Sequence, residues 1–297
     1  MGNTPLLPLS GPAFDRPGLR VLLKAEWLNP GGSVKDRAAR AILHAGVAAG
    51  ALPRRRLLDA SSGNTAVAYA MLGAAADIGV TVCVPTNVSS ERRILLRMYG
   101  AEVIDTDPLE GSDGAIRRAR EMAESEPDRY WYADQYGNAA NPKAHYVTTG
   151  PEIWNGTNQA VSHLVAGIGT SGTIMGAGRY LKERNRKIRV IGVQPSGPFH
   201  GLEGLKHLES AIVPPIYDST RIDSTIFVDT EHAEDAVRRL ARQHGIFLGW
   251  SAAAAVIAAE QLVSGLPPDR AATVVVVAPD GGTRYLSEET RLVGSAA

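Results

Sequence analysis

The chain has 297 residues, with 31 acidic and 31 basic side chains and a formal net charge of zero. This length fits one large domain or two domains of ordinary size. The balanced charge argues against a protein that binds nucleic acid or an anionic membrane through a basic surface.

Several simple classes of protein are excluded by the residue types and their spacing. The single cysteine, Cys83, lies in the apolar run VTVCVP, so we expect a core residue rather than a disulfide or metal ligand. The seven histidines show no metal-binding spacing, and we expect no metal centre. No stretch is long and apolar enough to span a membrane. The start, MGNTPLLPLS, lacks the pattern of a signal peptide, so we expect a cytoplasmic protein.

Short apolar runs alternate with helical patterns along the chain. The predicted strands are 20–27, 56–60, 81–85, 101–106, 163–168, 189–194, 225–229 and 272–279. The predicted helices are 34–46, 64–78, 89–99, 112–126, 142–154, 173–184, 231–244 and 252–264. This alternation predicts an α/β fold with mostly parallel, twisted sheets and helices on both faces. Two sheets fit the length better than one, with a boundary near 137–142.

The segment NPGGSVKDRAAR, residues 29–40, places one lysine between a glycine turn and a helix. Ser33 is a predicted N-cap, and Lys35 then lies in the first turn, where the helix dipole disfavours a cation. The chain has only six lysines against 25 arginines, which favours a lysine kept for its amine chemistry. The alternative is a solvated surface lysine paired with Asp36.

Two strand-to-helix loops are rich in small polar residues, and such loops bind ligands in parallel α/β folds. The first, 59–70, carries Ser61, Ser62, Asn64 and Thr65, which would form an anion cradle at a helix start or merely cap that helix. The second, 163–178, contains the pattern GxGxxG.

The GxGxxG pattern is formed by Gly167, Gly169 and Gly172, but the next strand ends at Gln194 without an acid for a ribose. Thr170, Ser171 and Thr173 add hydroxyl groups to the same loop. The loop therefore favours a cup for one phosphate monoester over a dinucleotide site.

A third loop, within 245–262, places Gly249-Trp250-Ser251 between a predicted strand and a helix. It looks like a hydrolase nucleophile elbow, but that mechanism needs a histidine downstream, and the last histidine is His244. We expect Ser251 to be an N-cap whose hydroxyl meets a ligand, or an N-cap alone.

A phosphate cup, a carboxylate cradle, a lone hydroxyl and a special lysine together favour one cofactor, pyridoxal 5'-phosphate (PLP), which forms an imine with a lysine amine. The order of motifs then resembles the cysteine synthase (O-acetylserine or O-phosphoserine sulfhydrylase) family of PLP enzymes, with the tryptophan-synthase-β-like fold (fold type II). These motifs are GNTPLL, NPGGSVKDR, SSGNT, DQYGNAANP, GIGTSGT, HGLEGLKHLESAIVP, GWSAA and PDGG. The segments ERRILLRMYGAEV and HYVTTGPEIW are most similar to the cysteine synthase B branch.

The resemblance implies a small domain with a mobile lid over 33–141, a larger phosphate-binding domain over 1–32 and 142–297, PLP in the cleft between them, and a homodimer. It implies that Lys35 forms the internal aldimine, Asn64 bonds the ring 3'-oxygen and Ser251 sits at the pyridine nitrogen. The phosphate would be held by Gly169, Thr170, Ser171, Gly172 and Thr173, and the substrate α-carboxylate by Ser61, Ser62, Thr65 and Gln135.

The activity that the resemblance implies is β-replacement on an O-activated L-serine through an α-aminoacrylate, giving L-cysteine from sulfide. Alternatives are a relative that makes cystathionine or 2,3-diaminopropionate, a catalytically silent partner protein of the same fold, and, from another class, a NAD-binding oxidoreductase. Ala66, Trp250, Ala252 and Ala253 depart from the family pattern. The last three would flank the cofactor.

Lys206 lies in the glycine-punctuated loop 200–210, which by resemblance faces the substrate. A basic residue there would provide the counter-charge for a phosphate leaving group, which keeps O-phosphoserine open beside O-acetylserine. The alternative is a solvated lysine paired with Glu203 or Glu209.

Overall fold

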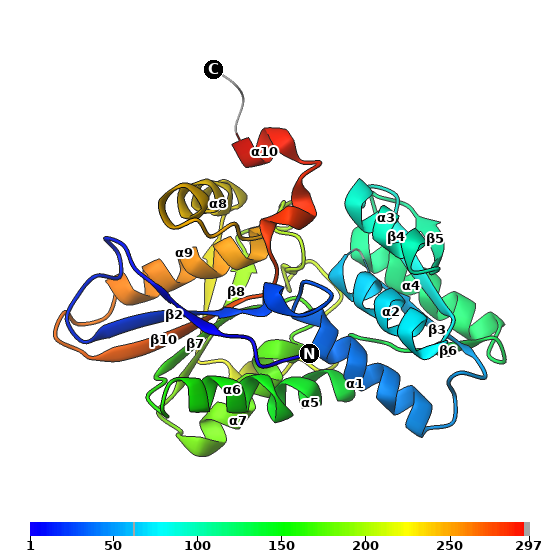
Figure 1. Cartoon of the computed structure of the whole chain (residues 1–297), viewed down its shortest axis with the longest axis horizontal. Helices are drawn as coiled ribbons and strands as arrows, with labels where there is room; N and C mark the ends of the chain where they lie inside the picture. Colours follow the sequence, from blue (N-terminus) through cyan, green and yellow to red (C-terminus); the bar gives the residue numbers. More distant parts are fainter. Residues whose placement is uncertain (62, 294–297) are drawn as a thin grey trace.

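The computed structural model describes residues 1–61 and 63–293 and forms two sheets flanked by helices (Figure 1). The larger sheet has the strand order β1-β2-β10-β7-β8-β9. Its strands are β1 (Leu6–Leu9), β2 (Leu19–Ala25), β7 (His163–Gly167), β8 (Arg189–Pro195), β9 (Ser224–Val228) and β10 (Ala272–Ala278). Only β1 runs antiparallel to its neighbour; the other pairs are parallel.

The smaller sheet is parallel throughout and has the strand order β5-β4-β3-β6. Its strands are β3 (Arg56–Ala60), β4 (Val80–Pro85), β5 (Glu102–Thr106) and β6 (Tyr130–Tyr132). All four lie within the predicted 33–141 range, while the division of the chain into domains at those limits stays a prediction.

The helices lie between the strands and cover the sheets. They are α1 (Lys35–Ala48), α2 (Asn64–Ala76), α3 (Ser90–Met98), α4 (Gly111–Ser125), α5 (Ala140–Val147), α6 (Thr149–Gly156), α7 (Gly172–Arg184), α8 (Thr230–His244), α9 (Trp250–Ser264) and α10 (Glu289–Val293). Among the residues that the structure describes, no helix is long and apolar enough to cross a membrane.

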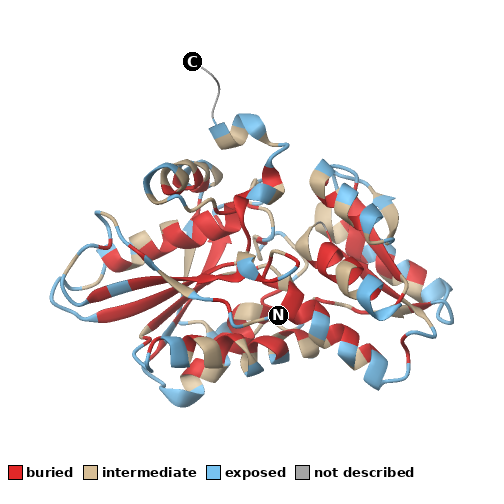
Figure 2. Cartoon of the chain, viewed as in Figure 1, coloured by how far each residue is buried: buried red, intermediate tan, exposed pale blue. Residues whose placement is uncertain are grey.

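The central strand β10 shows why both faces of the larger sheet are covered. Its seven residues are all buried (Figure 2). Alternate side chains along a strand point to opposite faces of the sheet. Val274 and Val276 pack with α8 and α9, whereas Val275 and Val277 pack with α6 and α7. A strand buried on both faces needs apolar residues at every position, which is the run that the sequence shows.

The smaller sheet is covered in the same way. Val80, Val82 and Val84 of β4 pack in the cluster that includes α1 and α2, and Cys83 packs on the opposite face with α4. Cys83 is buried, which confirms the predicted core position. The fold class predicted from the sequence is therefore confirmed.

Three local predictions were wrong. The short strands β1 and β6 were missed, since four and three residues give little periodicity. The predicted helix 142–154 is two helices, α5 and α6, because Pro151 lacks an N–H group and its ring would clash with the carbonyl four residues earlier. The strand predicted before Ser251 is only an isolated bridge between Leu248 and Gly281.

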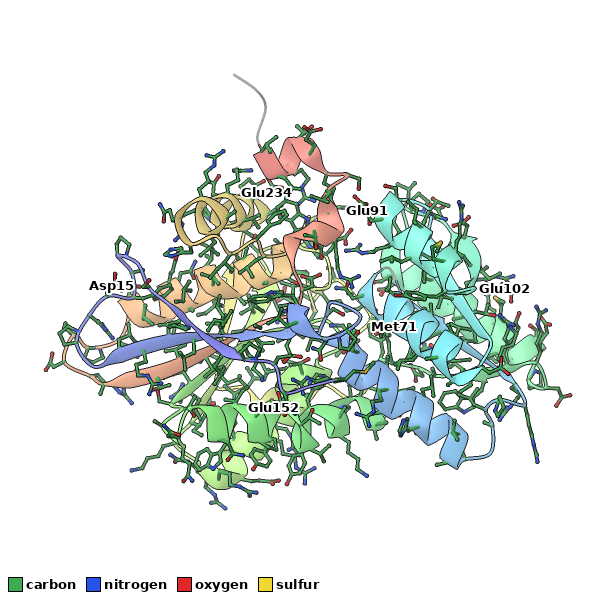
Figure 3. The ribbon with its side chains drawn as sticks, viewed as in Figure 1. Asp15, Met71, Glu91, Glu102, Glu152 and Glu234 are labelled. Atoms are coloured by element: carbon green, nitrogen blue, oxygen red, sulfur yellow. The ribbon has the colours of Figure 1, made fainter. Side chains whose placement is uncertain are left out.

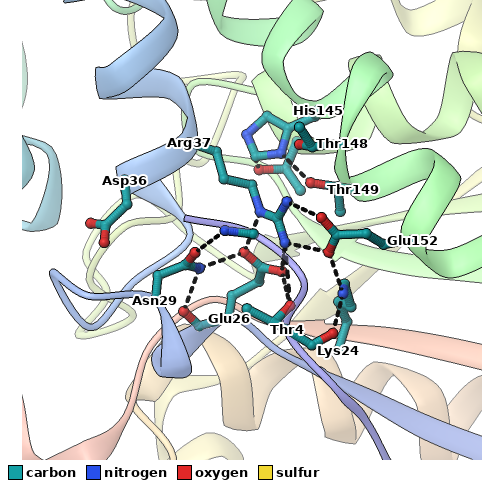
Figure 4. Close-up of polar contacts among 12 residues, drawn as sticks. Thr4, Lys24, Glu26, Asn29, Asp36, Arg37, His145, Thr148, Thr149 and Glu152 are labelled. Atoms are coloured by element: carbon teal, nitrogen blue, oxygen red, sulfur yellow. Dashed lines mark hydrogen bonds and ion pairs between the residues drawn. The ribbon is translucent and has the colours of Figure 1, made fainter. Parts of the chain in front are cut away.

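A buried cluster of charges joins β2, α1 and α6 (Figure 4). Arg37 pairs with Glu26 at 2.8 Å and with Glu152 at 2.7 Å, and Lys24 pairs with Glu152 at 2.6 Å. Glu152 lies on α6, below the N-terminal segment in the view of Figure 3, and its carboxylate accepts from the Asn3 N–H group of that segment. Although burial opposes its charge, the hydrogen bonds from Arg37 and Lys24 lower the pKa of Glu152 to about 2.

Replacing Glu152 with glutamine should lower stability in a pH-dependent way. The ordinary pKa of a glutamate is 4.5, and that of Glu152 in the folded chain is about 2. The charge of Glu152 therefore stabilises the fold fully above pH 4.5 and progressively less as the pH falls toward 2. We expect Glu152→Gln to lose roughly 2–3 kcal/mol at pH 7. Thermal melts should show the gap from the parent chain narrowing below pH 4.5. A gap that does not change with pH would contradict this account.

The matched control is Glu183→Gln on α7. Glu183 is exposed and pairs with Arg179 on the surface, where ion pairs contribute little. The melting temperature of the Glu183→Gln variant should equal that of the parent chain at every pH.

Candidate active site

A cavity opens at the carboxyl ends of strands from both sheets, where ligands bind in parallel α/β folds. It is lined by residues that follow β3, β7 and β10 and by the first turns of α1, α2, α7 and α9. The predicted site residues that line it are Lys35, Ser61, Asn64, Thr65, Gln135, Gly169, Thr170, Ser171, Gly172, Thr173, Lys206 and Ser251. Ser62 lies outside the described residues.

Lys35 lies in the first turn of α1, as the sequence predicted, although the helix begins at Lys35 itself, one residue later than expected. Its side chain lines the cavity. Burial lowers the pKa of Lys35, while the carboxylates of Asp280 and Glu26 oppose that shift. The surface alternative is wrong, because Asp36 is itself buried and accepts a hydrogen bond from the Gly31 N–H group. Ser33 is not the N-cap: the cap is Val34, and the Ser33 hydroxyl accepts from the Lys35 N–H group.

The loop before α2 is organised by its own hydroxyl groups. The Ser61 hydroxyl accepts from the N–H groups of Gly63 and Ala66, so it caps the helix start. The Thr65 hydroxyl donates to Gln135 at 2.8 Å, and the Gln135 amide donates to the carbonyl of Ala60 at 2.6 Å. Gln135 therefore holds this loop in place through two hydrogen bonds, and Gln135 also lines the cavity.

Asn64 contacts an acid that sequence reasoning did not single out. Its amide donates to Asp280 at 2.7 Å, and the Tyr285 hydroxyl donates to the same carboxylate oxygen at 2.7 Å. The other oxygen of Asp280 is buried without a hydrogen-bond partner among the described residues. Asp280 thus places a buried negative charge beside Asn64 and close to Lys35. Only the PDGG motif could have pointed to it.

The loop from Gly169 to Thr173 forms a tight cup at the start of α7. A Cβ atom at Gly169 would lie 2.1 Å from the Gly204 carbonyl oxygen, so only glycine fits there. Ser171 has a positive φ of 69°, and its buried hydroxyl has no partner among the described residues. The Thr170 oxygen accepts from Asn141 and from the Gly172 N–H group, which leaves its proton free for a ligand.

Ser251 is buried in the first turn of α9 and lines the cavity, but the predicted N-cap role is wrong. The helix begins one residue earlier, at Trp250, and Gly249 is its cap. Trp250 is buried, with its ring tilted against Tyr285 at 5.7 Å between centroids. The bulky residue noted in the sequence therefore packs into the core behind the site.

Two ion pairs cross the cavity from one half of the molecule to the other. Lys206 is 5% exposed and pairs with Asp113 of α4 at 2.6 Å. Arg92 of α3 pairs with Glu203 and stacks over the ring of Tyr285. The alternative of a solvated Lys206 paired with Glu203 or Glu209 is therefore wrong. The carboxylate of Glu91 on α3, which is labelled in Figure 3, accepts hydrogen bonds from the N–H and hydroxyl groups of Ser287.

The sequence also missed His145 of α5, which is buried behind the cup and contacts Thr173. Its spacing of four residues from Thr149 was the only local signal. Within residues 1–61 and 63–293, no three His, Cys, Asp or Glu side chains gather as metal ligands would.

Comparison with known proteins places the chain in a family. A family model described as "Pyridoxal-phosphate dependent enzyme" matches residues 1–280. The chain is 48% identical to a cysteine synthase of Aquifex aeolicus, over 97% of this chain and 89% of the relative. It is 38% identical to cysteine synthase B of Escherichia coli, over 97% and 93%. A crystal structure of cysteine synthase from Entamoeba histolytica superposes with a TM-score of 0.91 at 33% identity, covering 100% of this chain and 90% of that one.

Replacing Asp280 with asparagine should make the Lys35 amine more reactive. Asp280 stabilises the charged form of Lys35, so its loss should lower the pKa of that amine further. The measurement is the pH dependence of amine labelling, residue by residue, by mass spectrometry. The labelling midpoint of Lys35 should move to lower pH.

The exposed Lys143 on α5 serves as the internal reference in the same samples, and its labelling should not change. A Lys35 midpoint that stays in place or moves to higher pH would show that Asp280 does not set the charge on this amine.

Proposed function

The chain belongs to the family of pyridoxal-phosphate dependent enzymes, and from this membership we propose that it makes L-cysteine by β-replacement on an O-activated L-serine, with Lys35 as its catalytic amine. The observation that carries the proposal is the convergence of Lys35, Asn64, the cup from Gly169 to Thr173, and Ser251 on one cavity. Membership decides against the NAD-binding oxidoreductase.

The described residues fit PLP. The cup is narrow, because only glycine fits at position 169. The Thr170 hydroxyl has its proton free, and the buried Ser171 hydroxyl has no hydrogen-bond partner among the described residues. Together with the backbone N–H groups at the start of α7, these suit a phosphate dianion. We propose that Asn64 bonds the ring oxygen and that Ser251 faces the ring nitrogen. When bound, PLP supplies an electron sink for charge that develops on the substrate α-carbon.

Lys35 would attach the cofactor through its amine and then act on the substrate. Its pKa is lowered by burial, so an amine that can accept a proton forms more easily than on a surface lysine. Once the substrate amino group has replaced it, Lys35 Nζ is free to take the α-proton and later return it. Its place at the first residue of α1 holds it on a rigid element.

The substrate carboxylate would lie at the start of α2, where first-turn N–H groups lack helical partners. We propose that Ser61, Ser62 and Thr65 bind it, with Gln135 as their support. Because the Thr65 hydroxyl donates to Gln135, its backbone N–H group is the better donor for an anion. Closure of the two halves over the bound substrate would exclude water from the reaction.

A matrix of donors and nucleophiles tests the proposed reaction. O-acetylserine, O-phosphoserine, serine and cysteine are each combined with sulfide, thiosulfate, homocysteine and ammonia. Fastest turnover of an O-activated serine with sulfide supports cysteine synthesis. Homocysteine or ammonia as the best nucleophile would instead favour cystathionine or 2,3-diaminopropionate, and Trp250, Ala252 and Ala253 would then be the first positions to examine. No turnover with any pair would support the silent partner protein.

The homodimer and the cytoplasmic location expected from the sequence remain predictions. Light scattering on the purified protein measures the first. The proposed site residues that line the cavity come from a single chain and from both of its sheets.

Replacing Lys35 with alanine should abolish turnover and the visible absorption of lysine-bound PLP, because no other lysine that lines the described cavity follows a strand-to-helix turn. The fold should persist, since the helix α1 is held by Arg37. Absorption spectra and activity are measured beside Lys143→Ala, which removes an exposed lysine and should behave as the parent. Full turnover in the Lys35 variant would refute the assignment.

Replacing Lys206 with alanine should change the KM values for O-phosphoserine and O-acetylserine by different amounts. If Lys206 is the counter-charge for a phosphate leaving group, its loss should raise KM for O-phosphoserine about tenfold or more and spare O-acetylserine. Asp113→Asn is the matched control, because it keeps the lysine but removes its partner. That variant should lower KM for O-phosphoserine. Equal effects on both donors would leave Lys206 as a structural residue.

A further inference from the structure

His145 lies behind the cup, between two threonine hydroxyl groups. It is 1% exposed and comes from α5. Its Nδ1 atom lies 2.9 Å from the Thr149 hydroxyl, and its Nε2 atom lies 3.2 Å from the Thr173 hydroxyl. Figure 4 shows the ring beside Thr149, above the charged cluster. Thr173 lines the cavity, so the series of contacts from Thr149 through His145 to Thr173 ends at the cavity.

The imidazole is neutral in this place. Burial lowers the pKa of His145 well below its ordinary value, and the charges of Arg37 and Lys35 add to that shift, against Glu152 alone. A neutral imidazole has one donor nitrogen and one acceptor nitrogen, and each hydroxyl has one proton. Only two arrangements of the protons then satisfy both contacts.

In the first arrangement, Thr149 donates to Nδ1, and the Nε2–H group donates to the Thr173 oxygen. The proton of Thr173 is then free to point into the cavity. In the second arrangement, the Nδ1–H group donates to the Thr149 oxygen, and the Thr173 hydroxyl donates its proton to Nε2. Its oxygen then presents only lone pairs to the cavity, which repel an anion.

We propose that His145 is a positioning residue which, as the Nε2–H tautomer, directs the hydroxyl proton of Thr173 to the phosphate group of the cofactor. The inference rests on the proposed assignment of the cup to that phosphate. Thr170 reaches the same state by another route, because Asn141 and the Gly172 N–H group both donate to its oxygen. In both threonines of the cup, groups outside the cavity donate to the hydroxyl oxygen, and the hydroxyl proton is left to point into the cavity.

A double-mutant cycle tests the coupling. His145→Leu removes the donor, whereas His145→Gln places an amide N–H group at about the position of Nε2. Thr173→Val removes the hydroxyl and keeps the shape. The readout is PLP retention, measured as the dissociation constant of the cofactor by fluorescence titration of apoenzyme. We expect weaker binding by about tenfold or more in His145→Leu and recovery of most of it in His145→Gln.

In the Thr173→Val background, the change from His145 to leucine should have no further effect, because the proton that it directs is gone. An equal loss in both backgrounds would mean that His145 only packs, and would overturn the inference while leaving the cup in place. If Thr173→Val itself does not weaken PLP binding, the proposed role of Thr173 in the cup fails, and the inference fails with it.

The tautomer gives a second readout that packing alone would not change. Selective ¹⁵N labelling of histidine reports which ring nitrogen carries the proton, and His145→Gln identifies the signal by its loss. The holoenzyme should show His145 with a protonated Nε2 and a bare Nδ1. A protonated Nδ1 in the holoenzyme would overturn the inference.

Discussion

The buried charges beneath α1 determine where the reactive amine can lie. Arg37 donates to Glu26 through Nε and Nη2, and to Glu152 through Nη1 and Nη2, so its whole guanidinium group is fixed. Arg37 is two residues from Lys35 on the same helix turn. Since a buried ion without its partner is strongly destabilising, α1 cannot slide or rotate without breaking the cluster. The position of the Lys35 backbone is therefore set by charges outside the cavity.

The cavity itself depends on contacts between the two halves of the molecule. Asn64 meets Asp280, Arg92 meets Glu203, and Lys206 meets Asp113, and each pair joins the half that carries the smaller sheet to the half that carries the larger one. These contacts are polar and lie around the ligand space. A movement that opens the site must break them one after another, whereas the apolar cores of the two sheets can stay intact.

The parts of this architecture that sequence reasoning predicted are local. Apolar runs gave the long strands, and glycine-rich turns gave Lys35 and the cup from Gly169 to Thr173, because a turn and the helix after it are encoded within a few residues. Asp280, His145 and Asp113 were not predicted, since the cavity-lining residues that they contact, Asn64, Thr173 and Lys206, lie 28 or more residues away in the chain. The helix α1 starts at Lys35, one residue after the expected position, and α9 starts at Trp250, two residues before it, and local capping patterns do not resolve such differences.

The lysine at the start of α1 is unusual as an ammonium and reasonable as an amine. The helix dipole disfavours a cation in the first turn, and burial lowers the pKa of Lys35 further. The carboxylates of Asp280 and Glu26 act in the opposite direction and keep the charged form within reach. An amine that must bond covalently to a carbonyl carbon and also carry a proton needs both forms at accessible free energy. The opposing effects of burial and of two fixed carboxylates provide that balance at one atom.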